Sequence, residues 1–231
     1  MRVCATATGQ GLTIAAAVGL SLVLTQARAA APVPRVVEVP IRPAFVRPPG
    51  GKEIPARSGQ ILAPTTLLRT EKPGRLQVKL ANGRNFRLGG DAVLRLAADG
   101  LSLEKGQIIA WVNPSQKGGS PLKIRTRVAT ASIVGTTVFI DATAESLKVF
   151  SWEGLVRVET DRGRTYELRT GEQLSLEKGH WQPVRRLSQP EAAARRDKSI
   201  LLNGFSSVME TMPAIEQGLG LTPQPVRTVG P

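Results

Sequence analysis

The sequence predicts an all-β domain with a short α-helical C-terminal extension. Between residues 58 and 186, short runs alternate apolar and polar side chains, which is the pattern of half-buried strands. Glycine-containing turns separate these runs every few residues, and glycine tolerates the positive φ that tight turns require. The architectures that fit are a two-sheeted sandwich or a short solenoid-like domain of many short strands.

Residues 1–29 have the three-part order of a secretory signal peptide. A short start with Arg2 precedes an apolar run over residues 12–24, and Ala27-Arg28-Ala29 forms a small-x-small cleavage site. Such a run is too short to span a bilayer comfortably. Cleavage would remove Cys4, the one cysteine, and leave a mature chain without disulfides or thiolate ligands. The alternative is that residues 12–24 remain as an uncleaved anchor.

Residues 30–57 are rich in proline and are predicted to form a linker or an edge segment, because proline removes backbone donors from a strand ladder. Val37, Val39 and Ile41 alternate with other residues and leave room for one short strand.

The strands expected between residues 58 and 186 are read from the alternation. They cover residues 75–80, 85–88, 93–96, 101–104, 107–112, 122–128, 136–140, 146–150, 155–160, 165–168 and 173–176. The turns expected between them contain Asn82-Gly83, Asp99-Gly100, Lys105-Gly106, Glu153-Gly154, Arg162-Gly163, Thr170-Gly171 and Lys178-Gly179.

The word LSLEKG occurs twice, at residues 101–106 and 174–179. Residues 74–96 can also be laid over residues 154–176 without a gap, and the two LSLEKG words do not coincide in that register. We therefore interpret the word as a structural unit and not as a duplicated binding motif. In each copy two leucines would point inward, Glu-Lys would face water, and the glycine would turn the chain.

The alternation of apolar and polar residues ends in the C-terminal extension, predicted over residues 187–220. Ser188, Pro190 and Glu191 form a helix-start signal with a capping box, and one helix is expected to run to about residue 202. A second turn or helix follows Asn203-Gly204. Residues 221–231 are predicted to be a disordered tail.

The sequence offers little for catalysis, so we expect a non-enzymatic protein without a cofactor or a metal site. Its one histidine, His180, follows a turn, and no G-x-S-x-G elbow or glycine-rich phosphate loop is present. Aspartates are scattered singly among turns and strand ends. An envelope hydrolase would need His180 to act.

The charge suggests an anionic partner. The formal net charge is +13, and loss of Arg2 and Arg28 with the signal peptide would leave 29 − 18 = +11. Lys123, Arg125 and Arg127 alternate along one predicted strand and are the expected partner-binding residues; the alternative is that they form an ordinary solvated face. Nucleic acid is not expected, because the chain is predicted to be exported and has few aromatic residues.

Partners of this charge would be an envelope protein or an anionic wall or membrane component. Arg195, Arg196 and Lys198 allow peripheral membrane contact, but the apolar face of their helix is short and Ala-rich, so we expect this helix to pack on the domain.

Residues 58–184 contain an ordered set of motifs: G-R-x-x-V-x-L-x-x-G at 74–83, L-x-L-x-x-G at 101–106, R-T-x-x-A-x-x-x-x-x-G-T-x-x-x-I at 125–140, V-x-x-W-E-G-x-V-x-V at 149–158 and L-x-x-G-E-Q-L-x-L at 168–176. In this ordered set the segment resembles the FecR family of periplasmic signalling domains. Gly135 and Thr136 would hold the central turn. Val134 stands before them where the family usually has arginine.

The resemblance implies a place in the cell envelope, periplasmic or extracellular. Iron-transport regulators of the family have a cytoplasmic anti-sigma segment, a membrane helix and a periplasmic domain that meets an outer-membrane receptor. Here about 11 residues precede the apolar run. We therefore expect an exported, non-enzymatic binding or scaffold module. The alternative is a membrane-tethered, iron-responsive cell-surface signalling regulator with residues 12–24 as its anchor.

Overall fold

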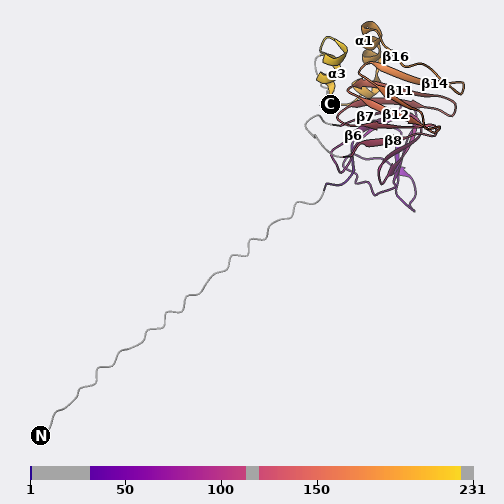
Figure 1. The fold of residues 1–231 in the computed structure, drawn as a ribbon. Coiled ribbons are helices and arrows are strands. Elements are labelled where there is room, and N and C mark those ends of the chain that lie inside the picture. The colour runs from indigo at the N-terminus through magenta and orange to yellow at the C-terminus, as the bar shows by residue number, and fades with distance from the viewer. Residues whose placement is uncertain (2–31, 113–119, 225–231) are drawn as a thin grey trace. The chain divides into compact units, whose positions relative to one another are not determined.

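The computed structural model describes residues 32–112 and 120–224, together with Met1 (Figure 1). The described part is a largely antiparallel β domain followed by short helices, which confirms the all-β fold class with its helical extension. The predicted signal peptide and the alternative anchor lie outside the described residues, as do residues 225–231 of the predicted tail.

The strands are β1 Arg35–Ile41, β2 Ala44–Arg47, β3 Ile54–Pro55, β4 Leu67–Thr70, β5 Arg75–Lys79, β6 Asn85–Ala97, β7 Gly100–Trp111, β8 Leu122–Arg125, β9 Ala129–Ile133, β10 Thr137–Ala142, β11 Leu147–Glu153, β12 Val156–Thr160, β13 Thr165–Leu168, β14 Glu172–Glu177, β15 His180–Trp181 and β16 Arg185–Arg186. The helices are α1 Gln189–Lys198, α2 Ile200–Asn203 and α3 Met212–Leu219.

The β6–β7 hairpin bends midway and so divides the sheet into two halves. Its pairing register shifts twice between Gly89 and Leu94. On one side of the bend β7 pairs in parallel with β8, and on the other side it pairs antiparallel with β10. The first half-sheet contains β2, β3, β4, β8, β9, β12 and β13, and the second contains β1, β5, β10, β11, β14, β15 and β16. One hydrogen-bonded network therefore supplies both halves.

The bend corrects the expected turn at Lys105-Gly106. The first LSLEKG copy lies wholly inside β7, where Gly106 has φ +93° and sits against Ala92. A Cβ at Gly106 would lie 2.3 Å from the Cα of Ala92, so the two backbones can approach only because glycine lacks a side chain. The second copy does end in a tight turn, with φ +49° at Lys178 and +77° at Gly179.

The proline-rich segment contributes strands to the sheet. β1 pairs antiparallel with β5, and β2 pairs with β4. Val36 is completely buried, whereas Val37, Val39 and Ile41, which follow it where the pairing register shifts twice, are half-buried. The register shifts explain why simple alternation does not describe this strand, since each bulge changes which side chains face inward.

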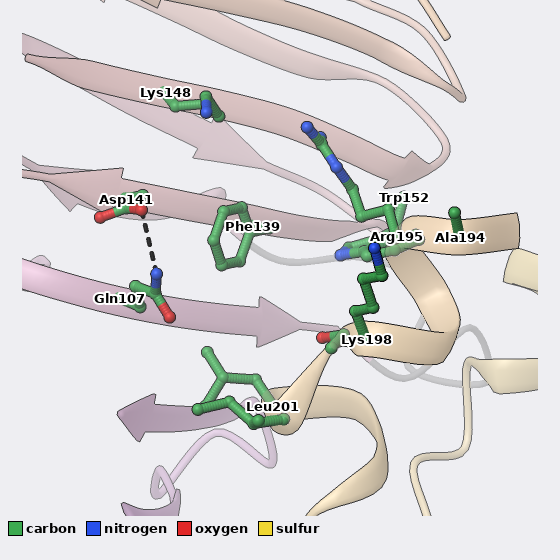
Figure 2. A pocket seen from close by; sticks show the side chains of 11 residues that line it. Gln107, Phe139, Asp141, Lys148, Trp152, Ala194, Arg195, Lys198 and Leu201 are labelled. Carbon is green, nitrogen blue, oxygen red and sulfur yellow. Dashed lines mark hydrogen bonds between the residues drawn. The ribbon is translucent and has the colours of Figure 1, made fainter. Parts of the chain in front are cut away.

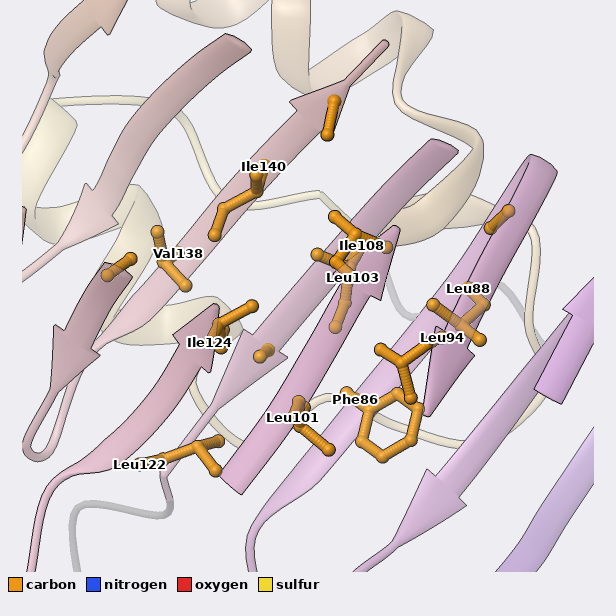
Figure 3. Close-up of a cluster of buried hydrophobic side chains, with 14 of the residues drawn as sticks. Phe86, Leu88, Leu94, Leu101, Leu103, Ile108, Leu122, Ile124, Val138 and Ile140 are labelled. Carbon is orange, nitrogen blue, oxygen red and sulfur yellow. The ribbon is translucent and has the colours of Figure 1, made fainter. Parts of the chain in front are cut away.

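The main core fills the space between the two half-sheets. Alternate residues of the long strands supply it (Figure 3), as the period of two in a strand requires. It includes Phe86, Leu88, Leu94, Leu101, Leu103, Ile108, Leu122, Ile124, Val138 and Ile140, all of them at most 1% exposed.

A second apolar cluster lies on the opposite face of the second half-sheet, beneath the helices. Ile109 and Trp111 of β7 and Phe150 and Trp152 of β11 are the sheet's contribution. The extension covers them with Leu187, Ala192, Leu201, Leu202, Phe205, Met209, Ile215 and Leu221. Ser188 and Glu191 form the expected capping box, with the Ser188 N–H donating to the Glu191 carboxylate over 2.8 Å. The expected single helix is interrupted at Ser199, which accepts a hydrogen bond from the backbone of Leu202 and starts α2.

Arg87 of β6 fastens the extension to the sheet. This side chain is 1% exposed, and its Nη1 donates to the carbonyls of Leu201 and Leu202 at 2.9 and 3.1 Å. Nε donates to Oε1 of Gln77 at 2.7 Å and Nη2 to the carbonyl of Ser207 at 2.5 Å. Burial lowers the pKa of Arg87 to about 10, although Glu38 and Glu210 oppose the shift. The cation therefore satisfies carbonyls at the end of α2 that would otherwise be buried without donors.

Two carboxylates complete the attachment. Glu38 of β1 accepts hydrogen bonds of 2.7–2.9 Å from the backbone and hydroxyl groups of Ser206 and Ser207. Glu216 of α3 pairs with Arg196 of α1 at 3.2 Å, and both are less than a tenth exposed. Glu216 also accepts from the backbone of Gln224 at 3.0 Å. The first residues of the predicted disordered tail therefore pack on the extension.

Candidate functional site

A groove runs between the second half-sheet and the start of the helical extension (Figure 2). Gln107, Asp141 and Lys148 form its sheet wall as neighbours on β7, β10 and β11, because Asp141 pairs with both of the others. They alternate with core residues, so their side chains point away from the core and toward the helices. The cavity has a volume of about 410 Å³, within the ~300–1,000 Å³ typical of ligand pockets.

The other wall comes from α1 and α2. Arg195 and Lys198 of α1 face the sheet wall, and Leu201 of α2 closes one end (Figure 2). Phe139 of β10 and Trp152 of β11 add aromatic surface to the sheet wall. The lining therefore combines three cations with apolar surface, and Asp141 is its one carboxylate.

Arg195 is held in place while one of its nitrogens stays free. Its guanidinium lies over the Phe150 ring, 4.4 Å from the centroid, and its Nη2 donates to Oε1 of Gln173 at 2.6 Å. Its buried Nη1 has no partner within the described part of the chain. Burial lowers the pKa of Arg195, with a further contribution from Arg185 that Glu191 opposes.

The described residues of the groove leave hydrogen-bond donors without acceptors. The indole Nε1 of Trp152 is a second buried donor without an acceptor among the described residues. Asp141 already accepts from Nε2 of Gln107 at 3.0 Å, whereas the ammonium groups of Lys148 and Lys198 have no ion-pair partner in residues 32–112 and 120–224. The groove is therefore suited to a ligand that supplies acceptors and negative charge beside an apolar group.

The structure places the three expected partner-binding residues elsewhere, on the first half-sheet. Lys123 and Arg125 lie on the outer side of β8 with buried Ile124 between them, and Arg127 lies beyond the end of the strand. Arg125 forms an ion pair with Asp99, Nη1 to Oδ1 being 2.5 Å. These hydrogen bonds lower the pKa of Asp99 to about 2.

Acidic residues share this outer face. Through the register of β8, β9, β12 and β13, Arg125 lies in one row with Glu159, and Lys123 lies in one row with Glu167. The alternation of Lys123, Arg125 and Arg127 therefore does not produce a uniformly basic surface.

Gly135 and Thr136 lie in the turn between β9 and β10. Gly135 has φ +60°, and Thr136 is 1% exposed with its methyl against Gly154. A Cβ at Gly154 would lie 2.4 Å from the Thr136 methyl carbon. The turn therefore packs closely against the β11–β12 connection, while Val134 beside it is 59% exposed.

His180 lies apart from the groove. It is exposed on β15, and its Nδ1 is 2.9 Å from the carbonyl oxygen of Lys178. Within the described ranges, no three His, Cys, Asp or Glu side chains gather closely enough to hold a metal ion. A helix long and apolar enough to cross a membrane is likewise absent from the described residues.

Residues 66–157 match the family model described as FecR protein. This segment of the chain is therefore similar to FecR proteins. It includes the turn at Gly135 and Thr136, and it supplies the sheet wall of the groove, whereas Arg195 and Lys198 lie outside the matched segment. The groove thus lies between the matched segment and the helical extension.

Two crystal structures of candidate anti-sigma factors from Parabacteroides distasonis ATCC 8503 are similar to the chain. The 2.50 Å structure has 20% sequence identity and a TM-score of 0.49, and the match covers 59% of this chain and 64% of that chain. The 1.65 Å structure has 21% identity and a TM-score of 0.44, with coverages of 52% and 60%. The chain thus spans less than two thirds of each neighbour's length. No curated protein matched the chain.

The groove was not predicted from the sequence. Gln107, Phe139 and Lys148 fall in strands that the alternation predicts, and Asp141 follows the predicted strand 136–140, but the sequence gives none of the four a role. One available signal is the alternation in β10 and at the start of β11, where Phe139, Asp141 and Lys148 stand between apolar residues. This pattern indicates that the three side chains point away from the core, but not that α1 lies opposite to them.

Proposed function

We propose that this chain is a non-enzymatic FecR-domain module that acts by binding a partner in the cell envelope. The observation that supports it most strongly is the FecR match over residues 66–157, since this is a family of signalling domains. The signal-peptide pattern of residues 1–29 supports export to the periplasm or the extracellular space.

A second candidate is a membrane-tethered signalling regulator in which residues 12–24 stay in the membrane. The FecR domain favours it too, because the family includes such regulators. The two candidates differ in the state of the N-terminus and in whether the domain reports to transcription.

Two measurements on cells that produce the full chain test these candidates. Mass spectrometry of the purified protein gives the mature N-terminus: a start at Ala30 supports the exported module, and an intact residue 1–29 segment supports the tethered regulator. Transcript profiling after deletion then separates the roles, because a regulator changes the expression of a defined gene set whereas a scaffold does not.

The non-enzymatic part of the proposal is tested with His180→Ala. This variant should complement the deletion strain as fully as the unaltered chain does, because His180 is exposed and does not line the groove. Failure of a well-folded His180→Ala protein to complement the deletion would favour a catalytic role.

A further inference from the structure

We infer that the groove between β7, β10, β11 and α1 is a binding site for a short acidic peptide segment of the partner protein. The inference rests on the proposed function, since it names the chemistry of the partner. It begins from the charges of the groove, where Lys148 on the sheet wall faces Arg195 and Lys198 on the helix wall and Asp141 is the one carboxylate of the lining (Figure 2).

The free donors specify an acceptor-rich ligand. Nη1 of Arg195 and Nε1 of Trp152 are both buried at the groove wall and lack acceptors in the described part of the chain. A buried donor without a partner costs about 1–3 kcal/mol, and a carboxylate or a peptide carbonyl can satisfy it. The side chain of Lys198, which lines the same groove, is exposed.

The apolar part of the lining argues for a peptide and not for a bare anion. Phe139 is half-buried and Ile200 is 45% exposed, and both line the cavity together with Leu201. An acidic side chain could meet Lys148 and Lys198 while its apolar neighbours cover Phe139 and Ile200. A stretch of alternating acidic and apolar residues fits this combination, because charge complementarity orients it and apolar burial adds affinity.

Because of the position of the groove, binding of such a peptide would affect the fold. One wall belongs to the FecR domain and the other to α1 and α2, which Arg87 fastens to the sheet. A ligand that bridges Lys148 and Lys198 would therefore couple the domain to its extension and stabilise their contact by mass action.

The test is a titration of the full purified chain, followed through the indole N–H resonances of its three tryptophans by nuclear magnetic resonance after assignment. The probe is the peptide acetyl-Leu-Glu-Leu-Asp-Leu-amide. Its controls are acetyl-Leu-Gln-Leu-Asn-Leu-amide and sodium acetate. We expect the acidic peptide to move the Trp152 resonance in a saturable way. Trp111 should move little, because its Nε1 already donates to Glu210 at 2.7 Å.

Charge reversals locate the site. Lys148→Glu and Lys198→Glu should each weaken binding about tenfold, because each replaces an attraction by a repulsion. Lys123→Glu makes the same change on the outer face of the first half-sheet and should leave binding unchanged. The undisturbed tryptophan resonances of each free variant show that it is folded.

Several results would overturn the inference. These are an equal response to the neutral peptide or to acetate, no saturable shift at Trp152, or a loss of binding in Lys123→Glu but not in Lys148→Glu and Lys198→Glu. If the titration fails while transcript profiling or complementation still shows a role in the envelope, the groove assignment falls and the proposed function stands.

Discussion

Replacing Arg87 by methionine should detach the helical extension from the sheet. Methionine keeps an unbranched apolar stem but removes every donor. The carbonyls of Leu201, Leu202 and Ser207 and the amide oxygen of Gln77 would each lose a hydrogen bond.

The magnitude follows from these four acceptors. At about 1 kcal/mol for each lost bond the change costs ~4 kcal/mol, and loss of the cation over the Phe205 ring, 4.4 Å away, adds ~0.5–1 kcal/mol. Relief from burying a charge offsets part of this loss. We expect the free energy of unfolding to fall by about 3–4 kcal/mol.

The assay is urea unfolding followed by circular dichroism, together with hydrogen exchange of the amides of residues 200–207. A loss of this size lowers the urea midpoint by ~1–2 M, given m of ~2–3 kcal/mol per M. Exchange at residues 200–207 should accelerate more than in β10 and β11. Arg95→Met is the matched control, because Arg95 is exposed and meets only Glu104 at 3.8 Å; it should cost less than ~1 kcal/mol. If Arg87→Met lowers the free energy of unfolding by less than ~1 kcal/mol and leaves hydrogen exchange at residues 200–207 unchanged, Arg87 does not hold the extension on the sheet.

Three further changes probe other features of the fold. Burial would raise the pKa of Glu38, but the hydrogen bonds from Ser206 and Ser207 outweigh the effect of burial and lower the pKa. The ionised Glu38 therefore stabilises the fold above pH ~4.5, and this stabilisation is lost as the pH falls. Glu38→Gln should flatten the acid side of the plot of unfolding free energy against pH, and an unchanged plot would contradict this. Burial raises the pKa of Glu153, although a 3.1 Å hydrogen bond from Thr137 opposes the shift. Ionisation of Glu153 therefore destabilises the fold as the pH rises above ~4.5. Glu153→Gln should raise the free energy of unfolding by about 1 kcal/mol at pH 7 in urea titrations, and a lower free energy of unfolding would contradict this. Gly106→Ala should lower the free energy of unfolding by more than ~2 kcal/mol. Gly163 has φ +76° and open space around it, so Gly163→Ala should lower the free energy of unfolding by only ~1 kcal/mol. Equal losses would show that the contact between Gly106 and Ala92 does not matter.

Much of the fold could be predicted because its determinants are local. The alternation of Leu101 and Leu103 identifies an inward face, and both are buried. The Ser188–Glu191 capping box marks the start of α1 for the same reason. These features depend on neighbours within a few residues, which the sequence displays directly.

The bend and the groove depend on contacts between distant segments. Gly106 looks like a turn glycine, and only its approach to Ala92 across the hairpin shows that it lies inside a strand. Likewise Lys148 and Lys198 are 50 positions apart and line one groove only because the helical extension packs on the sheet. The alternation of Lys123 and Arg125 is local and was recognised, but the acids that oppose them come from other strands and from a turn.

The groove is tested most directly as the partner-binding site by photo-crosslinking in the living cell, with a photoreactive amino acid placed at Lys198 or, as the comparison, at Lys123. We expect a specific protein adduct from position 198 that the acidic peptide suppresses when added to spheroplasts, and no such adduct from position 123. An adduct from position 123 alone, or an adduct from position 198 that the acidic peptide leaves unchanged, would contradict the assignment of the groove as the partner-binding site.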